Sequence, residues 1–137
     1  MNTDCIFCKI VSNQAPSSVV YEDHEVLAFM DIRPVNVGHT LIIPKQHFVD
    51  VFDVPDELLG KIYTSTKRIA KAVKKVVEAD GISIVQQNGS AAGQDIFHFH
   101  VHVIPRFEGA KIPRFHELSV ASRQSLDEIA ARIRSEM

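Results

Sequence analysis

The sequence predicts an α+β fold built on a largely antiparallel sheet of five strands. Three short β-type segments precede one long segment of helical period, and two further β-type segments follow it. Strands that succeed one another without a helix between them favour antiparallel pairing. The chain has 137 residues and a hydrophobic content of 45%, which is enough for a core, so we expect a single domain over residues 1–137.

The first three strands are expected before the long helix. Residues 19–21 and 25–31 flank the polar corner 22–24, which predicts a hairpin. Residues 38–43 form the third strand, and Pro44 is expected to end it because proline cannot donate to a ladder inside a sheet.

The long helix is expected from about Pro55 to Ala79, where apolar side chains recur at helical spacing. Pro55 suits its start, and Gly81 suits its end. Residues 82–87 and 97–105 predict the fourth and fifth strands, joined by a segment rich in turn residues. Residues 106–118 have no clear period, and apolar positions between 126 and 133 predict a short C-terminal helix.

Charge and composition limit the partners. A net charge of -2, with acids and bases mixed along the chain, gives no general attraction to nucleic acid or to a membrane surface. Any phosphate site must therefore be local. The chain has no apolar run of membrane length and starts without the basic and apolar regions of a secretory signal, so we expect a cytoplasmic protein.

Three histidines recur at a two-residue step within residues 97–105. In a strand, this step places His98, His100 and His102 on one face, about 6.6 Å apart, and the alternating apolar residues on the other. Imidazoles on an apolar strand lose solvation and need partners or a ligand. A neutral imidazole can attack phosphorus at physiological pH. The same spacing also suits ligands of a catalytic metal, and three core histidines bonded to backbone are the third interpretation.

The string HFHVHVIPR, from His98 to Arg106, resembles the signature of the histidine-triad (HIT) family. Four further blocks resemble those of the family in order, at residues 5–10, 28–32, 38–47 and 87–94. The blocks thus cover residues 5–106, with a tail and helix at 107–137, and they are most similar to the Hint-like bacterial branch. The resemblance implies the histidine-triad fold, a homodimer whose sheets join across the subunits, and no organic cofactor.

The resemblance also implies an enzyme. It would be a nucleotide hydrolase or nucleotidyl transferase acting at the α-phosphorus of AMP or GMP derivatives, such as phosphoramidates or dinucleoside polyphosphates, through a nucleotidyl-histidine intermediate. His100 would be the nucleophile, His102 would lie against the phosphate or leaving group, and His39 and His98 would support the catalytic site. The base, the leaving group and the physiological substrate stay open.

Two further sets of residues follow from the resemblance. A structural Zn²⁺ would be held by Cys5, Cys8, His47 and His98, and Cys-x-x-Cys spacing in a reducing compartment itself favours metal binding or redox exchange over a disulfide. The nucleotide would be held by Phe7, Ile10, Phe29 and Ile32 around the base, Asp31 at the ribose, and Asn88, Gly93 and Gln94 near the phosphate, together with Asp95, His100 and His102. A plain turn residue is the other interpretation of Asn88.

Asp95 departs from the family pattern, because many close relatives carry serine after the Gly-Gln pair. An ionised carboxylate there would repel a phosphate to which a hydroxyl could donate. The preference for phosphoramidates is therefore an open question. A protein that only binds nucleotides is the alternative from a different functional class, and tight binding without turnover would identify it.

Overall fold

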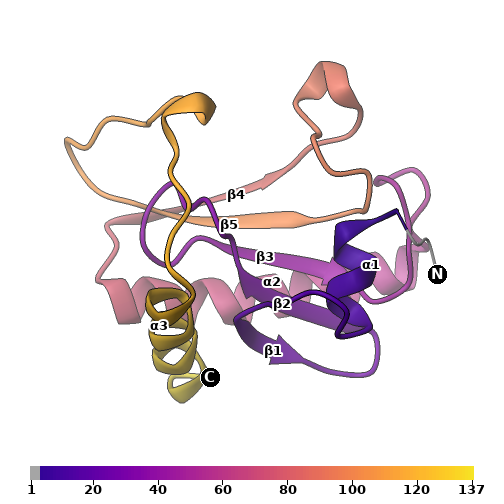
Figure 1. The fold of residues 1–137 in the computed structure, drawn as a ribbon, viewed down its shortest axis with the longest axis horizontal. Helices are drawn as coiled ribbons and strands as arrows, with labels where there is room; N and C mark the ends of the chain where they lie inside the picture. Colours follow the sequence, from indigo (N-terminus) through magenta and orange to yellow (C-terminus); the bar gives the residue numbers. More distant parts are fainter. Residues whose placement is uncertain (1–3) are drawn as a thin grey trace.

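Residues 4–137 are described by a computed structural model, in which one long helix covers one face of a five-stranded sheet (Figure 1). The strands are β1 (Val19–Glu22), β2 (Val26–Met30), β3 (Thr40–Pro44), β4 (Gly81–Gln86) and β5 (Val101–Arg106). The helices are α1 (Ile6–Val11), α2 (Asp56–Val77) and α3 (Arg123–Ser135), with single 3₁₀ turns at Ser90–Ala92 and Phe115–Glu117. No helix of the described residues is long and apolar enough to cross a membrane.

The sheet has the order β1-β2-β3-β5-β4, and all four pairings are antiparallel. This confirms the predicted α+β fold with its antiparallel sheet, long helix and C-terminal helix. The central pairing of β3 with β5 sets Leu41 beside His102, and β4 sets Val85 beside the same histidine. The third histidine thus lies in the middle of the sheet.

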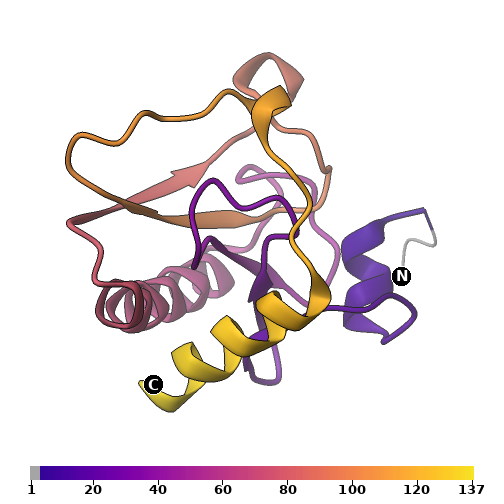
Figure 2. The same cartoon turned by 60° about the vertical axis from the view of Figure 1, so that its left-hand side comes forward.

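Both faces of the central strands are buried, because each face carries its own core. Alternate residues such as Ala28, Ile42 and Val103 pack under α2 and α3. The intervening residues, among them Phe29 and Leu41, pack under α1 on the opposite face. Figure 2 shows α1 and α2 on opposite sides of the sheet. Because side chains alternate along each strand, one face of the sheet packs against α2, and the opposite face packs against α1 and carries the histidines.

The fifth strand is shorter than predicted. It begins at Val101, and residues 97–100 are irregular. Phe97 is 48% exposed although Phe99 is fully buried. The backbone N–H of Phe99 donates to the carbonyl of Phe48 at 2.6 Å, so this segment is held by a loop and not by a strand ladder. His98 and His100 therefore precede the strand, and only His102 lies within it.

Three other boundaries differ from expectation. Pro44 is the last residue of β3 and pairs with Val26, since a strand end tolerates a residue that cannot donate. Helix α2 ends at Val77, and the next residue, Glu78, caps it in the left-handed conformation at φ 55°, while Gly81 begins β4. Helix α1 was not predicted, because a six-residue helix is too short to show a period.

Candidate functional site

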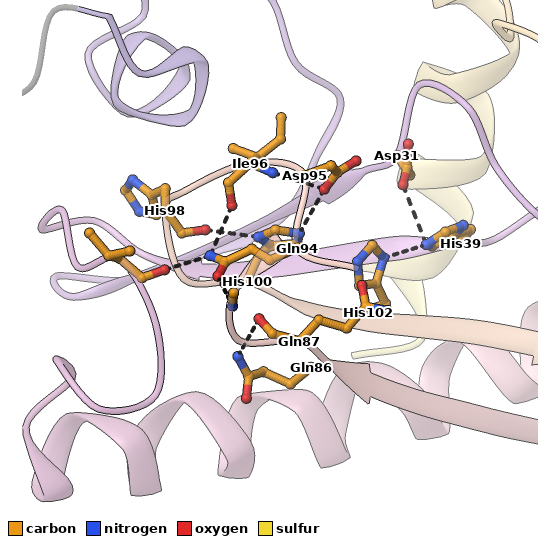
Figure 3. Close-up of polar contacts among 12 residues, drawn as sticks. Asp31, His39, Gln86, Gln87, Gln94, Asp95, Ile96, His98, His100 and His102 are labelled. Carbon is orange, nitrogen blue, oxygen red and sulfur yellow. Dashed lines mark hydrogen bonds and ion pairs between the residues drawn. The ribbon is translucent and has the colours of Figure 1, made fainter. Parts of the chain in front are cut away.

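The histidine segment leads into β5 in the middle of the sheet, and its first and last histidines, His98 and His102, belong to two different clusters of potential metal ligands. Figure 3 shows His98, His100 and His102 with His39 and Asp31. His98 faces the cysteines of α1. His102 faces His39, which lies just before β3. His100 lies between them, with its ring centroid 4.9 Å from that of His102.

The His100 ring is fixed by the backbone of His98. Its Nδ1 lies 2.8 Å from the carbonyl oxygen of His98, and a carbonyl only accepts, so Nδ1 carries the hydrogen. Burial lowers the pKa of His100, which keeps the ring neutral. Nε2 therefore has a free lone pair, and it lies 3.7 Å from the Asp95 carboxylate. Phe7 holds the ring edge-on at 5.3 Å between centroids. The arrangement presents an unprotonated nitrogen in a defined orientation.

A hydrogen-bond chain fixes the tautomer of His102. The backbone N–H of Val35 donates to Nδ1 of His39 at 3.0 Å, so a neutral His39 carries its hydrogen on Nε2. That hydrogen points to Nδ1 of His102, 3.0 Å away. Burial lowers the pKa of His39 to about 3 and that of His102 to about 4, so both rings are neutral. His102 must then carry its own hydrogen on Nε2, as a donor.

Asp31 lies at the start of this chain, with a carboxylate oxygen 3.4 Å from Nε2 of His39. Its other oxygen accepts the backbone N–H of Arg33 at 2.9 Å. Burial raises the pKa of Asp31 to about 6. At neutral pH an ionised Asp31 thus faces a neutral His39, so the contact is not an ion pair, and the Nε2 hydrogen of His39 is directed to His102.

An apolar cavity opens beside His100. It is lined by residues from α1, from β2 and from the segment after β2, and it includes Phe7, Ile10, Phe29, Asp31, Ile32, His100 and His102. These seven residues were named from the sequence, and the fold brings them to one cavity. Its volume is about 140 Å³, which is below the range of about 300–1,000 Å³ typical of ligand pockets. Ile6 and Ile32 line it and are 43% and 48% exposed, so they stand at its rim.

The loop after β4 holds the other residues named from the sequence. The side chain of Asn88 bonds Val51 and Gln86, and the buried Gln94 bonds Gly89, Val49 and Ile96. Gly93 has φ 93°, and a Cβ there would lie 2.6 Å from Nε2 of Gln87. The side chains of Asn88 and Gln94 are therefore used to shape the loop, and the cavity beside His100 is not lined by them.

Asp95 does reach the cavity. One carboxylate oxygen accepts the backbone N–H of Ile96 at 2.9 Å and also lies nearest to Nε2 of His100. Its side chain is 53% exposed, so it lies at the mouth.

Cys5, Cys8, His47 and His98 converge on a second centre. Cys5 caps α1, with the backbone N–H of Cys8 donating to its sulfur at 3.3 Å. Nδ1 of His98 lies 3.4 Å from the Cys5 sulfur and 3.6 Å from the Cys8 sulfur. Nδ1 of His47 lies 3.3 Å from the Cys8 sulfur and 3.2 Å from Nδ1 of His98. Burial raises the pKa of the Cys5 thiol.

This donor set fits a tetrahedral ion. Zinc bonds of about 2.0–2.1 Å to nitrogen and about 2.3 Å to sulfur imply donor separations of roughly 3.3–3.8 Å, close to those of the cluster. Nε2 of His98 lies 2.8 Å from the carbonyl of Pro44 and therefore carries the hydrogen, which leaves the Nδ1 lone pair aimed at the centre. The donor set is therefore compatible with a bound zinc ion.

The geometry does not favour a catalytic metal shared by His98, His100 and His102. Within residues 4–137, neither cluster of potential metal ligands contains His100, and His98 and His102 belong to different ones. The second cluster is Asp31, His39 and His102. A metal there would need an unprotonated Nε2 on His39. Because the backbone N–H of Val35 donates to Nδ1 of His39, the hydrogen of the neutral ring is on Nε2.

Sequence reasoning missed Arg33, Arg106 and the backbone donor of Val35. Arg106 could have been recognised, because it continues the even-numbered face that carries His102 and Ile104. Nothing in the sequence indicated that Val35 contributes to the site, because its contribution is a backbone N–H, which nearly every residue has.

Comparison with known proteins agrees with this geometry. The family model of the HIT domain matches residues 12–109. A crystal structure of a Hit-like protein involved in cell-cycle regulation from Bartonella henselae is 41% identical, with a TM-score of 0.91 over 100% of this chain and 99% of that one. A Zn-bound histidine triad family protein from Mycobacterium smegmatis is 40% identical, with a TM-score of 0.84 over 96% of this chain and 91% of that one.

Among curated relatives, the adenylylsulfatase HINT3 of Arabidopsis thaliana is 38% identical over 108 residues, which are 79% of this chain and 55% of that protein. The match to the HIT domain spans most of the chain, including the segment that carries the three histidines. The chain therefore belongs to the HIT family.

Proposed function

We propose that this protein is a nucleotide hydrolase that acts at the α-phosphorus of purine nucleoside monophosphate derivatives through a covalent adduct on His100. The observation that carries the proposal is the neutral His100 ring, whose Nδ1–H is held by the backbone and whose free Nε2 faces an apolar cavity. Family membership and a relative named an adenylylsulfatase support it. Phosphoramidates and dinucleoside polyphosphates are the substrate classes to compare.

The first half-reaction joins Nε2 of His100 to phosphorus while the bond from phosphorus to the leaving group breaks. The positive charge that develops on the ring is stabilised at Nδ1–H by the carbonyl of His98. His102 offers its Nε2–H to a phosphoryl or leaving-group oxygen. Water then attacks phosphorus, the electron pair of the P–N bond returns to His100, and the nucleoside monophosphate leaves with release of a proton.

The nucleoside takes the apolar cavity in this proposal. Phe7, Ile10 and Phe29 pack on the base, and Asp31, ionised at neutral pH, accepts hydrogen bonds from the ribose hydroxyls. Because the cavity is small, Ile6 and Ile32 at its rim must move apart as the base enters.

A Zn²⁺ ion held by Cys5, Cys8, His47 and His98 would have a structural role. It would tie α1 to the segment before β5, and so would hold Phe7 against His100. The Zn-bound relative from Mycobacterium smegmatis supports this assignment. Zinc content by elemental analysis, measured on the protein as purified, tests it without reference to activity.

We also infer a homodimer. Strand β4 lies at the edge of the sheet and is bonded to β5 alone. Beside it, Tyr63 and Ile84 are 40% and 48% exposed on a shallow surface shared with Ala70 and Ile82. An uncovered strand edge with apolar neighbours suits pairing with a second copy. Light scattering should give a dimer for the wild type and a monomer for Ile84→Lys, and a monomeric wild type would refute the inference.

Steady-state rates test the function. The wild type should turn over at least one of adenosine phosphoramidate, a dinucleoside polyphosphate and a nucleotidyl sugar. His100→Ala should abolish turnover and retain nucleotide binding, because it removes the nucleophile. His24→Ala is the matched control, since this histidine is exposed in the turn between β1 and β2. Tight binding without turnover in the wild type would instead identify a nucleotide-binding regulator.

A further inference from the structure

The turn before β3 holds the hydrogen-bond chain that ends at His102. The backbone N–H of Val35 donates to Nδ1 of His39 at 3.0 Å. Nε2 of His39 lies 3.0 Å from Nδ1 of His102, a contact that Figure 3 shows. A nitrogen that accepts a hydrogen bond carries no hydrogen, so this geometry by itself makes both rings neutral with their hydrogens on Nε2. His102 lines the cavity beside His100 and also a larger adjoining cavity of about 520 Å³.

The hydrogen of His39 has a second acceptor within reach. One carboxylate oxygen of Asp31 lies 3.4 Å from the same Nε2. The two acceptors compete, and a small rotation of the His39 ring towards Asp31 would release Nδ1 of His102. The released ring could then carry its hydrogen on Nδ1, and its Nε2 would become an acceptor that repels phosphoryl oxygens. The orientation of His39 thus decides whether His102 can donate to a substrate.

One side chain ties this turn to the strand that carries His102. Nδ2 of Asn36 donates to the carbonyl of Pro105 in β5 at 2.7 Å. The backbone carbonyl of Asn36 accepts the backbone N–H of His39 at 3.1 Å. Among residues 33–38, all of which the structure describes, Asn36 is the only one whose side chain makes a hydrogen bond. It therefore connects the first histidine of the pair to the strand of the second.

The tie lies where the ladder between β3 and β5 stops. Thr40 is the first residue of β3, and it pairs with Val103, the last residue of β5 that has a partner in β3. Beyond Val103, the Asn36 amide supplies a bond to β5 at Pro105. The amide thus holds the turn against β5 at the point where the backbone of β3 no longer does.

We propose that Asn36 is a positioning residue that keeps the hydrogen of His39 directed to His102. With Asn36 in place, Nε2–H of His102 stays a donor to the reacting phosphate, whereas without it His39 turns towards Asp31. Asn36 lines neither cavity, so it acts only through the two histidines. The kinetic consequence rests on the proposed function, but the tautomer of His102 can be observed without a substrate.

Nitrogen NMR of protein labelled at the histidine rings shows which nitrogen of each ring carries hydrogen. In the wild type at neutral pH, His39 and His102 should both carry it on Nε2. Asn36→Leu has nearly the same size but no donor for the Pro105 carbonyl, and it should move His102 towards the Nδ1–H tautomer. Asn36→Gln keeps an amide donor and should restore part of the Nε2–H population. An unchanged tautomer in Asn36→Leu would overturn the inference.

Steady-state rates give the kinetic readout. Asn36→Leu should lower kcat about three- to tenfold, the range expected for the loss of one hydrogen bond in the transition state. KM should change little, because Asn36 lines neither cavity. The loss should appear both with adenosine 5′-phosphoramidate and with an anhydride such as diadenosine tetraphosphate, since His102 faces the phosphate in either case. A rise in KM with kcat unchanged would contradict a role through His102.

Thr40→Val is the matched control for stability. The Thr40 hydroxyl donates to the Gly38 carbonyl at 2.9 Å within the same turn, and Thr40 is fully buried. Valine keeps the shape and removes this bond, so the melting temperature should fall about as much as in Asn36→Leu. The tautomer of His102 and kcat should stay as in the wild type. A tautomer shift in both variants would mean a general loosening of the turn and would overturn the assignment to Asn36.

The positioning role and the proposed function fail separately. A tautomer shift in Asn36→Leu, in a protein whose wild type turns over no nucleotide, would overturn the proposed function and leave the role of Asn36 standing. Turnover by the wild type, with a loss of kcat in Asn36→Leu but no tautomer shift, would uphold the proposed function and overturn the positioning role.

Discussion

Replacing Asp95 by serine should raise turnover, and the gain should be larger for phosphoramidates than for anhydrides. One Asp95 oxygen lies 3.7 Å from Nε2 of His100, where the phosphoryl oxygens must come during attack. Two unit charges about 4 Å apart repel by about 1 kcal/mol in water and by about 4 kcal/mol near a protein surface. Because the Asp95 side chain is 53% exposed, the lower figure applies, and it corresponds to about a fivefold gain in kcat/KM.

Asp95→Asn separates charge from hydrogen bonding. It removes the charge but retains an oxygen that can accept the backbone N–H of Ile96, so it should raise kcat/KM on both substrate classes about equally. The serine hydroxyl can also donate to a phosphate or leaving group, which should shift the ratio towards the amidate. Steady-state rates on one amidate and one polyphosphate decide the matter. An unchanged ratio in Asp95→Ser, together with lower thermal stability, would show that the carboxylate only holds the loop.

The remaining predictions concern the metal centre, acid stability and the loop after β4. His98→Ala should lose bound zinc and thermal stability, whereas His100→Ala should retain both; full zinc occupancy in His98→Ala would remove the structural-zinc assignment. Since burial lowers the pKa of His39 from 6.5 to about 3, its contribution to stability is complete above pH 6.5 and is lost as the pH falls towards 3. Asp31 has the opposite effect: because its pKa is raised from 3.8 to about 6, its contribution to stability increases as the pH falls from about 6 to 3.8. The melting temperature of His39→Gln should therefore fall less steeply than that of the wild type as the pH is lowered from 6.5 to 4.5. Parallel plots of melting temperature against pH would contradict this. Gly93→Ala should lower the unfolding free energy by roughly 1–3 kcal/mol through strain at φ 93° and a clash, measurable by urea denaturation.

Local patterns in the sequence predicted the faces of the sheet well. Alternation assigned Val101 and Val103 to one core and His102 to the opposite face, and that is their arrangement. The same alternation predicted that Phe97 would be buried, and this was wrong. The strand begins only at Val101, because the backbone N–H of Phe99 bonds the carbonyl of Phe48 and not a neighbouring strand. A strand's end depends on its partners, and β4 supplies no residue opposite that segment after Gln86.

The composition of the site was accessible from the family blocks, but its proton positions were not. Sequence alone could name His39 and His102 without showing that Val35 decides which nitrogen of each carries hydrogen. The loop after β4 is a similar case. Gln94 was expected to contact phosphate, and Asn88 either to contact phosphate or to serve as a turn residue. Their hydrogen bonds with Gly89 and Val51 are visible only once the loop is formed.

The most direct test of the account is the position of the covalent adduct. Incubation of the wild type with a slowly hydrolysed nucleotide should add the mass of one nucleoside monophosphate. Peptide mapping should place it on His100, because among His98, His100 and His102 this ring alone has an unprotonated Nε2 beside the cavity. The adduct should be absent from His100→Ala and present in His24→Ala. An adduct on any other residue, or turnover without one, would contradict the assignment of His100 as the nucleophile.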